Sequence, residues 1–299
     1  MKRMVISLVL VAIVVVVSPV SGHELQVVTT FSILEDLVQQ VGGDRVIVNS
    51  LVPRGSDPHS WEPTPREARM VAQAELLIAN GGGFDDWLLG LMKNAAKVDS
   101  LLVFASQGLE ALEHGHAHGE GDDHNHHHGD PHFWLNVPNS IFYVDQITQG
   151  LVTASPDDAS YFQERSRAYI EELVELDEWI VGECEKIPRE NRVIVTYHNA
   201  FSYLAAGYGF EVAEFLVTNP EAEPSPRDLA RLVDLLGGMN KRVLFAEPQL
   251  TSGTRYMQAL AKEVGGELYT LYSDSLSTEI STYVEMMKYN TRTLVEALE

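Results

Sequence analysis

The fold of this chain is limited most by an alternation of strand and helix patterns that occurs twice. Short apolar runs predict strands at 25–31, 46–52, 76–80 and 101–105, and again at 192–197, 211–216, 242–246 and 267–272. Between them, apolar residues spaced three to four apart predict helices. This order favours parallel sheets with helices on both faces. We therefore predict an α/β protein of two lobes, each a mainly parallel sheet flanked by helices.

A long helical stretch separates the two series. It follows the segment Ser155-Pro156-Asp157-Asp158, its apolar positions recur every three to four residues, and Pro188 ends it. We expect one long rigid helix that joins the lobes. The predicted organisation is a signal peptide at 1–22, an N-terminal lobe at 23–154 with a histidine-rich loop at 113–130, the linking helix at 155–188 and a C-terminal lobe at 189–299.

Two short motifs predict helix starts. Thr64 and Glu67 have the spacing of a capping box, with proline at the first helical position between them. Ser32 and Glu35 have the same spacing ahead of an apolar-periodic stretch. We expect both hydroxyl groups to cap their helices.

The first 22 residues have the order of a secretory signal. Lys2 and Arg3 precede an apolar run at 4–17, and small residues follow before a plausible cut between Gly22 and His23. The run is short for a bilayer span, and an uncleaved anchor is the alternative. No cysteine lies near the cut, so lipid attachment by that route is not expected. We predict a periplasmic location, or one on the extracytoplasmic cell surface.

Charge and cysteine content exclude several classes of protein. The formal net charge is −22, from 21 basic and 43 acidic residues, so nucleic acid and anionic lipid are not expected partners. Cys184 is the only cysteine, which excludes an intramolecular disulfide and a zinc site built on several thiolates. We expect a monomer that is stabilised by its core.

The pentapeptide Asp-Pro-His-x-Trp occurs twice, at 57–61 and at 130–134. Proline fixes the backbone around the aspartate, so each histidine leaves a stiff turn in a defined direction. Imidazole is the commonest metal ligand, and a nearby carboxylate can orient its second ring nitrogen. We expect each tryptophan to form an apolar wall. The alternative is a pair of turns whose histidines only cap loops.

Four metal-donor side chains follow predicted strands. His59 and His132 lie after strands of the first series, and His198 and Asp274 after strands of the second. In open α/β sheets, ligands bind beyond the carboxyl ends of the strands. Three imidazoles and one carboxylate suit zinc, which accepts four ligands in a tetrahedron. The sequence therefore predicts a zinc site between the lobes.

The predicted loop at 113–130 has seven histidines, four glycines and five acidic residues, with no large apolar residue. Such a segment cannot order itself by burying surface. We interpret it as a secondary, weaker metal-capture or sensing loop, and the alternative is a solvated linker. Its histidines are His114, His116, His118, His124, His126, His127 and His128.

Several motifs together resemble the ZnuA-like zinc-binding members of the metal-specific solute-binding proteins that serve ABC importers. They are Asp57-Pro58-His59, the histidine-rich loop with Trp134-Leu135 after it, His198-Asn199-Ala200-Phe201, Asn219-Pro220-Glu221 and Phe245-Ala246-Glu247-Pro248-Gln249. The resemblance covers the whole mature chain. It implies an extracytoplasmic binding protein that captures Zn(II) and delivers it to a membrane permease.

Residue by residue, the resemblance places the three histidine ligands on His59, His132 and His198, and the carboxylate ligand on Asp274. Manganese-binding relatives have a glutamate where this chain has His198, so the third histidine favours zinc. The chain departs from the family at Asp274-Ser275, where Asp-Pro is usual. Water or another acidic residue, as in some zinc-specific relatives, is the alternative fourth ligand. For Glu247 we expect a hydrogen-bonding or interface role rather than metal ligation.

Other functions stay open on the sequence alone. A manganese-binding homologue and a surface adhesin of the same fold would share most of these motifs. A secreted zinc hydrolase could use the three histidines with Glu247 as the base, but the chain has no His-Glu-x-x-His motif and Asp274 would fill the position of the catalytic water. We therefore predict a binding protein and not an enzyme.

Overall fold

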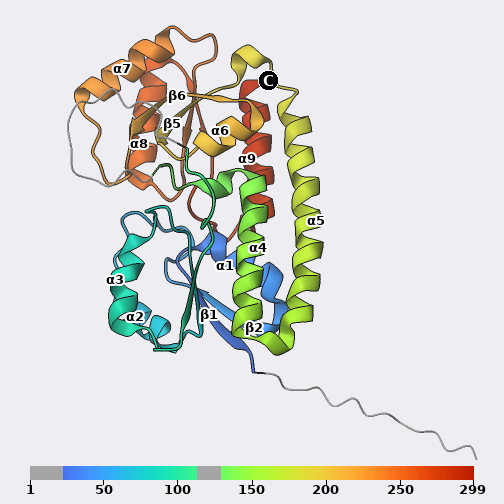
Figure 1. The fold of residues 1–299 in the computed structure, drawn as a ribbon. Helices are drawn as coiled ribbons and strands as arrows, with labels where there is room; N and C mark the ends of the chain where they lie inside the picture. Colours follow the sequence, from blue (N-terminus) through green and yellow to red (C-terminus); the bar gives the residue numbers. More distant parts are fainter. Residues whose placement is uncertain (1–22, 113–128) are drawn as a thin grey trace, which may run out of the picture.

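The computed structural model describes residues 23–112 and 129–299, which form two four-stranded sheets (Figure 1). The strand orders are β2-β1-β3-β4 and β6-β5-β7-β8, and the strand pairs described are parallel. The strands are β1 (Leu25–Thr29), β2 (Val46–Ser50), β3 (Leu76–Ala79), β4 (Leu101–Phe104), β5 (Val193–His198), β6 (Glu211–Val217), β7 (Val243–Ala246) and β8 (Glu267–Thr270). The predicted two-lobed α/β architecture is confirmed.

Helices cover both faces of each sheet. They are α1 (Ser32–Gly42), α2 (Pro65–Gln73), α3 (Asp86–Ala95), α4 (Val137–Ala154), α5 (Ala159–Cys184), α6 (Ser202–Tyr208), α7 (Pro226–Gly237), α8 (Thr251–Val264) and α9 (Tyr283–Leu298). In Figure 1, α2 and α3 lie on one side of the first sheet and α7 and α8 on the same side of the second, while α4, α5 and α9 lie on the opposite side.

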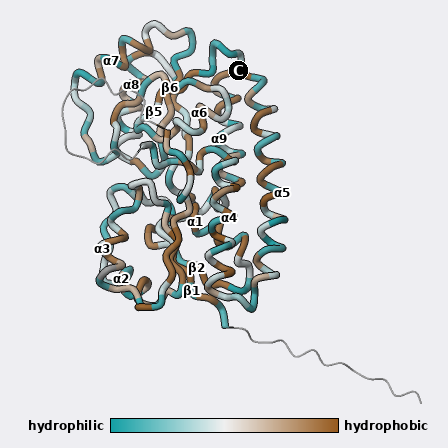
Figure 2. The backbone as a smooth tube through the Cα atoms, in the orientation of Figure 1, coloured by the Kyte–Doolittle hydropathy of each residue, from teal (hydrophilic) through white to brown (hydrophobic). Residues whose placement is uncertain are grey.

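One hydrophobic core extends through both lobes. It includes Leu34 of α1, Val144 of α4, Leu173 of α5, Phe245 of β7 and Leu294 of α9, all at most 1% exposed. Figure 2 shows apolar residues along the strands and alternating apolar and polar residues along α5. Because close-packed interiors resist deformation, this common core holds the two sheets in a fixed relative position.

The linking helix is confirmed but shorter than expected. Helix α5 has 26 residues, and a separate 3₁₀ turn at Pro156–Asp158 precedes it. The hydroxyl of Ser155 donates to the Asp158 carboxylate at 2.9 Å instead of capping the helix backbone. The helix lies along both lobes and packs against α1, α4 and α9 (Figure 1).

The two predicted capping boxes have different outcomes. Thr64 caps α2 with Glu67, as expected. The prediction for Ser32 is wrong, because Ser32 is the first residue of α1 and its hydroxyl accepts the backbone N–H of Leu276 at 2.9 Å. A contact with a residue 244 positions away has replaced the local cap.

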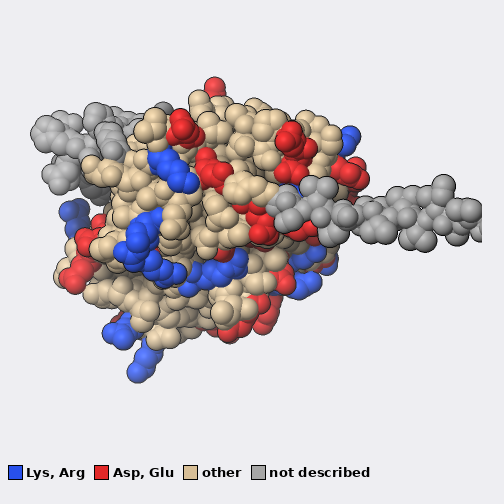
Figure 3. Space-filling model, turned by 90° about the horizontal axis from the view of Figure 1, so that it is seen from below, with Lys and Arg blue, Asp and Glu red and all other residues tan. Residues whose placement is uncertain are grey.

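The surface is not uniformly acidic. The face in Figure 3 has Lys and Arg side chains beside Asp and Glu. Arg66, Arg69 and Lys97 are among the exposed basic residues of this lobe. None of the helices within 23–112 and 129–299 combines the length and apolar character that a bilayer span requires. The predicted signal at 1–22 lies outside the described residues.

We expect truncation of Leu173 to destabilise the fold substantially, because its side chain is fully buried where α5 meets the common core. The substitution Leu173→Ala should lower the free energy of unfolding by about 2–5 kcal/mol, as large-to-small core substitutions do. The neighbouring Val174→Ala is the matched control, since Val174 is 43% exposed, and it should change stability by less than about 1 kcal/mol. Denaturant unfolding measures both values. Equal losses would contradict a common core braced by α5.

Candidate metal centre

The structure brings the four predicted donor side chains together between the lobes. His59 lies in the loop after β2, His132 immediately before the short 3₁₀ helix Phe133–Leu135, His198 at the end of β5 and Asp274 after β8. One ligand atom from each lies within 4.8 Å of the others. His132, His198 and Asp274 are buried, and the side chain of His59 is 16% exposed.

The separations between the donor atoms fit a small metal ion. The Nε2 atoms of His59 and His132 are 3.3 Å apart. Asp274 Oδ2 lies 3.5 Å from Nε2 of His59 and 3.4 Å from Nε2 of His198, and Oδ1 lies 3.6 Å from Nε2 of His132. Tetrahedral zinc bonds of about 2.0–2.1 Å place neighbouring ligand atoms roughly 3.3–3.4 Å apart. The four separations are close to this spacing, and the contacts of Asp274 use both of its oxygens.

Three buried atoms of the cluster have no hydrogen-bond partner among the described residues: Nε2 of His198 and both carboxylate oxygens of Asp274. Burial alone would raise the pKa of Asp274, but the imidazoles of His198 and His132 outweigh it and hold that pKa well below its usual range. A buried carboxylate costs free energy unless a cation or donors compensate it. The cluster thus presents the buried carboxylate oxygens of Asp274, which make no hydrogen bonds, to a cation.

Two of the histidines each have a carboxylate partner on the ring nitrogen Nδ1. Nδ1 of His132 lies 2.7 Å from Asp130 Oδ1, and Nδ1 of His198 lies 2.9 Å from Glu247 Oε1. A proton on Nδ1 that is donated to the carboxylate leaves Nε2 free as a metal ligand. Burial lowers the pKa of His198, but Glu247 and Asp274 outweigh it and raise that pKa to about 10. Glu247 therefore has the hydrogen-bonding role expected from the sequence.

The duplicated pentapeptide forms the same turn twice. The backbone N–H of His59 donates to Asp57 Oδ1, and that of His132 donates to Asp130 Oδ1, each at 3.0 Å. The side chains then differ. The Asp130 carboxylate also meets the imidazole of its own histidine, whereas Asp57 accepts the hydroxyl of Ser60 at 2.7 Å. His132 is therefore held more firmly than His59.

The expectation of two tryptophan walls is right for one copy only. The ring of Trp134 is fully buried, with its centroid 5.4 Å from that of His132. The ring of Trp61 instead pairs with Trp87, at a centroid distance of 5.3 Å. The turns are alike because they are local, but the neighbours of each tryptophan depend on the tertiary packing.

Phe84 forms the second apolar wall, and sequence reasoning missed it. Its ring centroid is 4.9 Å from that of His59 and 5.8 Å from that of His132. The preceding glycines, Gly81–Gly83, all have positive φ, which lets the chain turn sharply after β3. A glycine run at the carboxyl end of a predicted strand was the available signal for this position.

The seven histidines of the predicted loop all lie within 113–128, outside the described residues. The two ends of that segment meet beside the site, since the backbone N–H of Asp130 donates to the carbonyl of Leu112 at 2.8 Å. Tyr203 joins both ends, because its hydroxyl oxygen accepts the N–H of Leu112 and its O–H donates to the carbonyl of Asp130, each at 2.9 Å. These bonds form a neck that lies two residues from His132.

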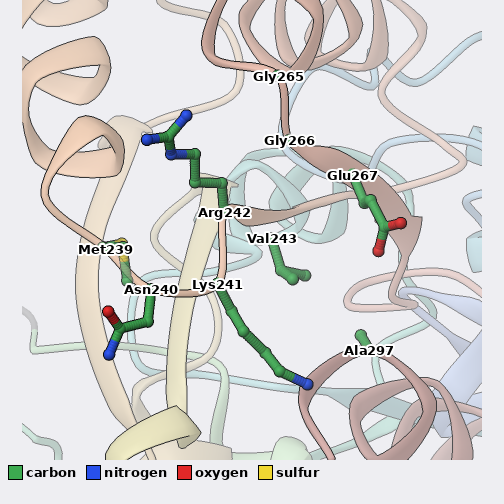
Figure 4. Close-up of a pocket in the computed structure, with 9 residues that line it drawn as sticks. All are labelled: Met239, Asn240, Lys241, Arg242, Val243, Gly265, Gly266, Glu267 and Ala297. Atoms are coloured by element: carbon green, nitrogen blue, oxygen red, sulfur yellow. The ribbon is translucent and has the colours of Figure 1, made fainter.

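A cavity of about 430 Å³ lies at the opposite end of the second sheet, near Val243 and Glu267, which begin β7 and β8 (Figure 4). In Figure 4 the Arg242 side chain points away from Ala297, and its Nη1 donates to the carbonyl of Val264 at 2.7 Å. The four clustered donors do not line this cavity. They lie instead at the carboxyl ends of strands, after β2, at the end of β5 and after β8.

Two parallel-sheet lobes, a long linking helix and a buried histidine–aspartate cluster between them define a metal-binding protein of the extracytoplasmic substrate-binding class that serves ABC importers. The chain belongs to the ZnuA family, described as zinc-uptake complex component A, periplasmic, whose model matches residues 27–297. Members of this family are solute-binding transport proteins.

Individual relatives are similar over nearly their full length. The manganese-binding lipoprotein MntA of Halalkalibacterium halodurans is 34% identical over 284 residues, which cover 93% of this chain and 89% of that protein. The manganese ABC transporter substrate-binding lipoprotein PsaA of Streptococcus pneumoniae is 32% identical over 287 residues, covering 93% and 90%. The solved structure of the periplasmic zinc-binding protein TroA of Treponema pallidum matches with a TM-score of 0.82 and 26% identity, covering 93% and 99%.

We expect Glu247→Gln to weaken metal binding, because glutamine keeps the shape but removes the charge that orients and polarises the His198 ring. Loss of such a supporting carboxylate typically costs about 10–100-fold in metal affinity. Competition titration with a chelator measures the affinity. The exposed Glu263→Gln, on α8, removes the same charge and should leave affinity unchanged. Equal affinities of the Glu247 variant and the native protein would contradict an orienting role.

Proposed function

We propose that this protein captures one Zn(II) ion between its lobes and delivers it to an ABC-type permease for import. His59, His132, His198 and Asp274 are the proposed ligands. The observation that carries the proposal is their convergence on one point, with one ligand atom of each within 4.8 Å of the others and the oxygens of Asp274 left without hydrogen bonds. The zinc ion is the cargo, and the protein's own groups bind it and exclude water.

The donor set supports zinc over manganese. Within the described residues the cluster contains three imidazoles and a single carboxylate, and Glu247 is engaged on the far ring nitrogen of His198. Manganese favours oxygen-rich sites of higher coordination, whereas imidazole suits zinc. The manganese-binding names of MntA and PsaA favour the alternative, so metal preference is the decisive measurement.

The donor set also supports transport over hydrolysis. A catalytic zinc usually keeps three protein ligands and an open position for water, whereas Asp274 supplies a fourth donor here. For localisation we propose export through the segment 1–22 to the periplasm or the extracytoplasmic surface. Several relatives are named lipoproteins, but the only cysteine of this sequence is Cys184, which is buried in α5. We propose a monomer with the permease as partner.

We expect the alanine variants of His59, His132 and His198 each to lose tight zinc binding while the fold persists, since each removes one of four ligands. Calorimetric titration should give one tight ion for the native protein, and dissociation constants at least about tenfold higher for the variants. His23→Ala, an exposed histidine 73% accessible at its side chain, is the control. Unchanged affinity in any one ligand variant removes that residue from the site.

A variant without residues 114–128 should keep the tight site, because the neck at Leu112 and Asp130 remains.

We expect a large excess of manganese to displace little bound zinc. The reason is the nitrogen-rich donor set, and the measurement is the zinc content of the protein after equilibrium dialysis against both ions. His198→Glu provides the comparison, because it exchanges an imidazole for an oxygen donor and should shift the balance towards manganese. Ready displacement of zinc from the native protein would establish the manganese-binding alternative.

A further inference from the structure

The segment that contains Asp274 crosses from one lobe to the other. It leaves the second sheet after β8, where the N–H of Leu271 still donates to the carbonyl of Ala246 at 3.1 Å. Five residues later the chain is bonded to the first lobe, through Leu276 and the hydroxyl of Ser32 in α1. Asp274 lies at the crossing point, so its position depends on contacts with both lobes.

The carboxylate of Asp274 has no hydrogen bond of its own that fixes it. Its direction in the metal-free protein therefore depends on how the backbone on either side is held. On the preceding side, the carbonyl of Ser273 accepts the indole N–H of Trp134 at 2.8 Å, and its hydroxyl accepts the side-chain amide of Gln249 at 2.8 Å. Trp134 belongs to the first lobe and Gln249 to the second, so these two bonds hold the residue before Asp274 to both lobes.

On the following side, two buried serine hydroxyls hold the backbone. Ser275 Oγ accepts the backbone N–H of Gly55 at 2.8 Å, and the carbonyl of Leu276 accepts the same N–H at 2.8 Å. Ser32 Oγ accepts the N–H of Leu276 at 2.9 Å. Ser275 and Ser32 are 2% and 1% exposed. Because Gly55 belongs to the loop that bears His59, these bonds connect two of the donors.

We infer that Ser275 and Ser32 are positioning residues for the metal site: the Ser275 hydroxyl holds the Asp274 segment to the His59 loop, the Ser32 hydroxyl holds it to α1, and together they set how slowly the ion leaves. The inference rests on the proposed function, since it takes Asp274 and His59 as ligands. It also gives a role to the serine at the position where the family resemblance led us to expect proline. A proline there would have no hydroxyl for the Gly55 N–H.

The test compares Ser275→Ala, Ser32→Ala and the double variant with native protein, all as the full mature chain. Zinc dissociation is followed after mixing with excess chelator. Each single variant should release zinc roughly threefold to tenfold faster, the worth of one hydrogen bond, and the double variant faster still. Ser166→Ala is the matched control, because Ser166 is also a buried serine, 4% exposed, whose Oγ accepts the hydroxyl of Thr148 at 2.9 Å, but it lies on α5.

A second readout separates positioning from general stability. Cobalt(II) in place of zinc has a visible spectrum that reports coordination geometry, and the Ser275 and Ser32 variants should change it while Ser166→Ala does not. All three substitutions should lower the melting temperature by similar small amounts. Unchanged dissociation rates and cobalt spectra in the double variant, with tight zinc binding by the native protein, would overturn this inference alone. Absence of tight zinc binding by the native protein would overturn the proposed function as well.

Discussion

The burial of the Asp274 charge among three imidazoles is the constraint on which the rest of the structure depends. Without hydrogen bonds to its oxygens, this carboxylate is tolerated because the neighbouring histidines compensate its charge, and His198 keeps a pKa of about 10 between Asp274 and Glu247. Removing either partner would leave an uncompensated buried charge, which is costly. The protein must therefore hold donors from both lobes within a few ångströms, and the core that extends through both lobes supplies the necessary rigidity.

Local patterns predicted the strands, most helices and the direction of the histidines, because these depend on neighbours in sequence. Thr64 caps α2 and His198 ends β5 as its pattern indicated. Two of the failures involve distant partners. Ser32 has a capping sequence, yet Leu276 takes its hydroxyl, and Trp61 has the same turn as Trp134 but packs against Trp87. No local signal distinguishes a serine that caps its own helix from one that holds a segment 244 positions away.

The three histidines of the site differ in how firmly they are held. His132 and His198 each have a carboxylate on the second ring nitrogen and are buried, whereas the Asp57 carboxylate next to His59 is used by Ser60 and the backbone. His59 is also the most exposed donor. An ion that reaches this centre from solvent therefore meets the least restrained ligand first, and two firmly oriented imidazoles lie behind it.

Metal choice in such a centre depends on more than the four ligands. An imidazole and a carboxylate at one strand end differ by a single residue, so overall identity near 30% to proteins named for manganese does not decide the metal. Both oxygens of Asp274 face the histidines, Oδ1 towards His132 and Oδ2 towards His59 and His198. A carboxylate held in one direction favours a compact four-ligand site, while a looser segment would allow the higher coordination that manganese prefers.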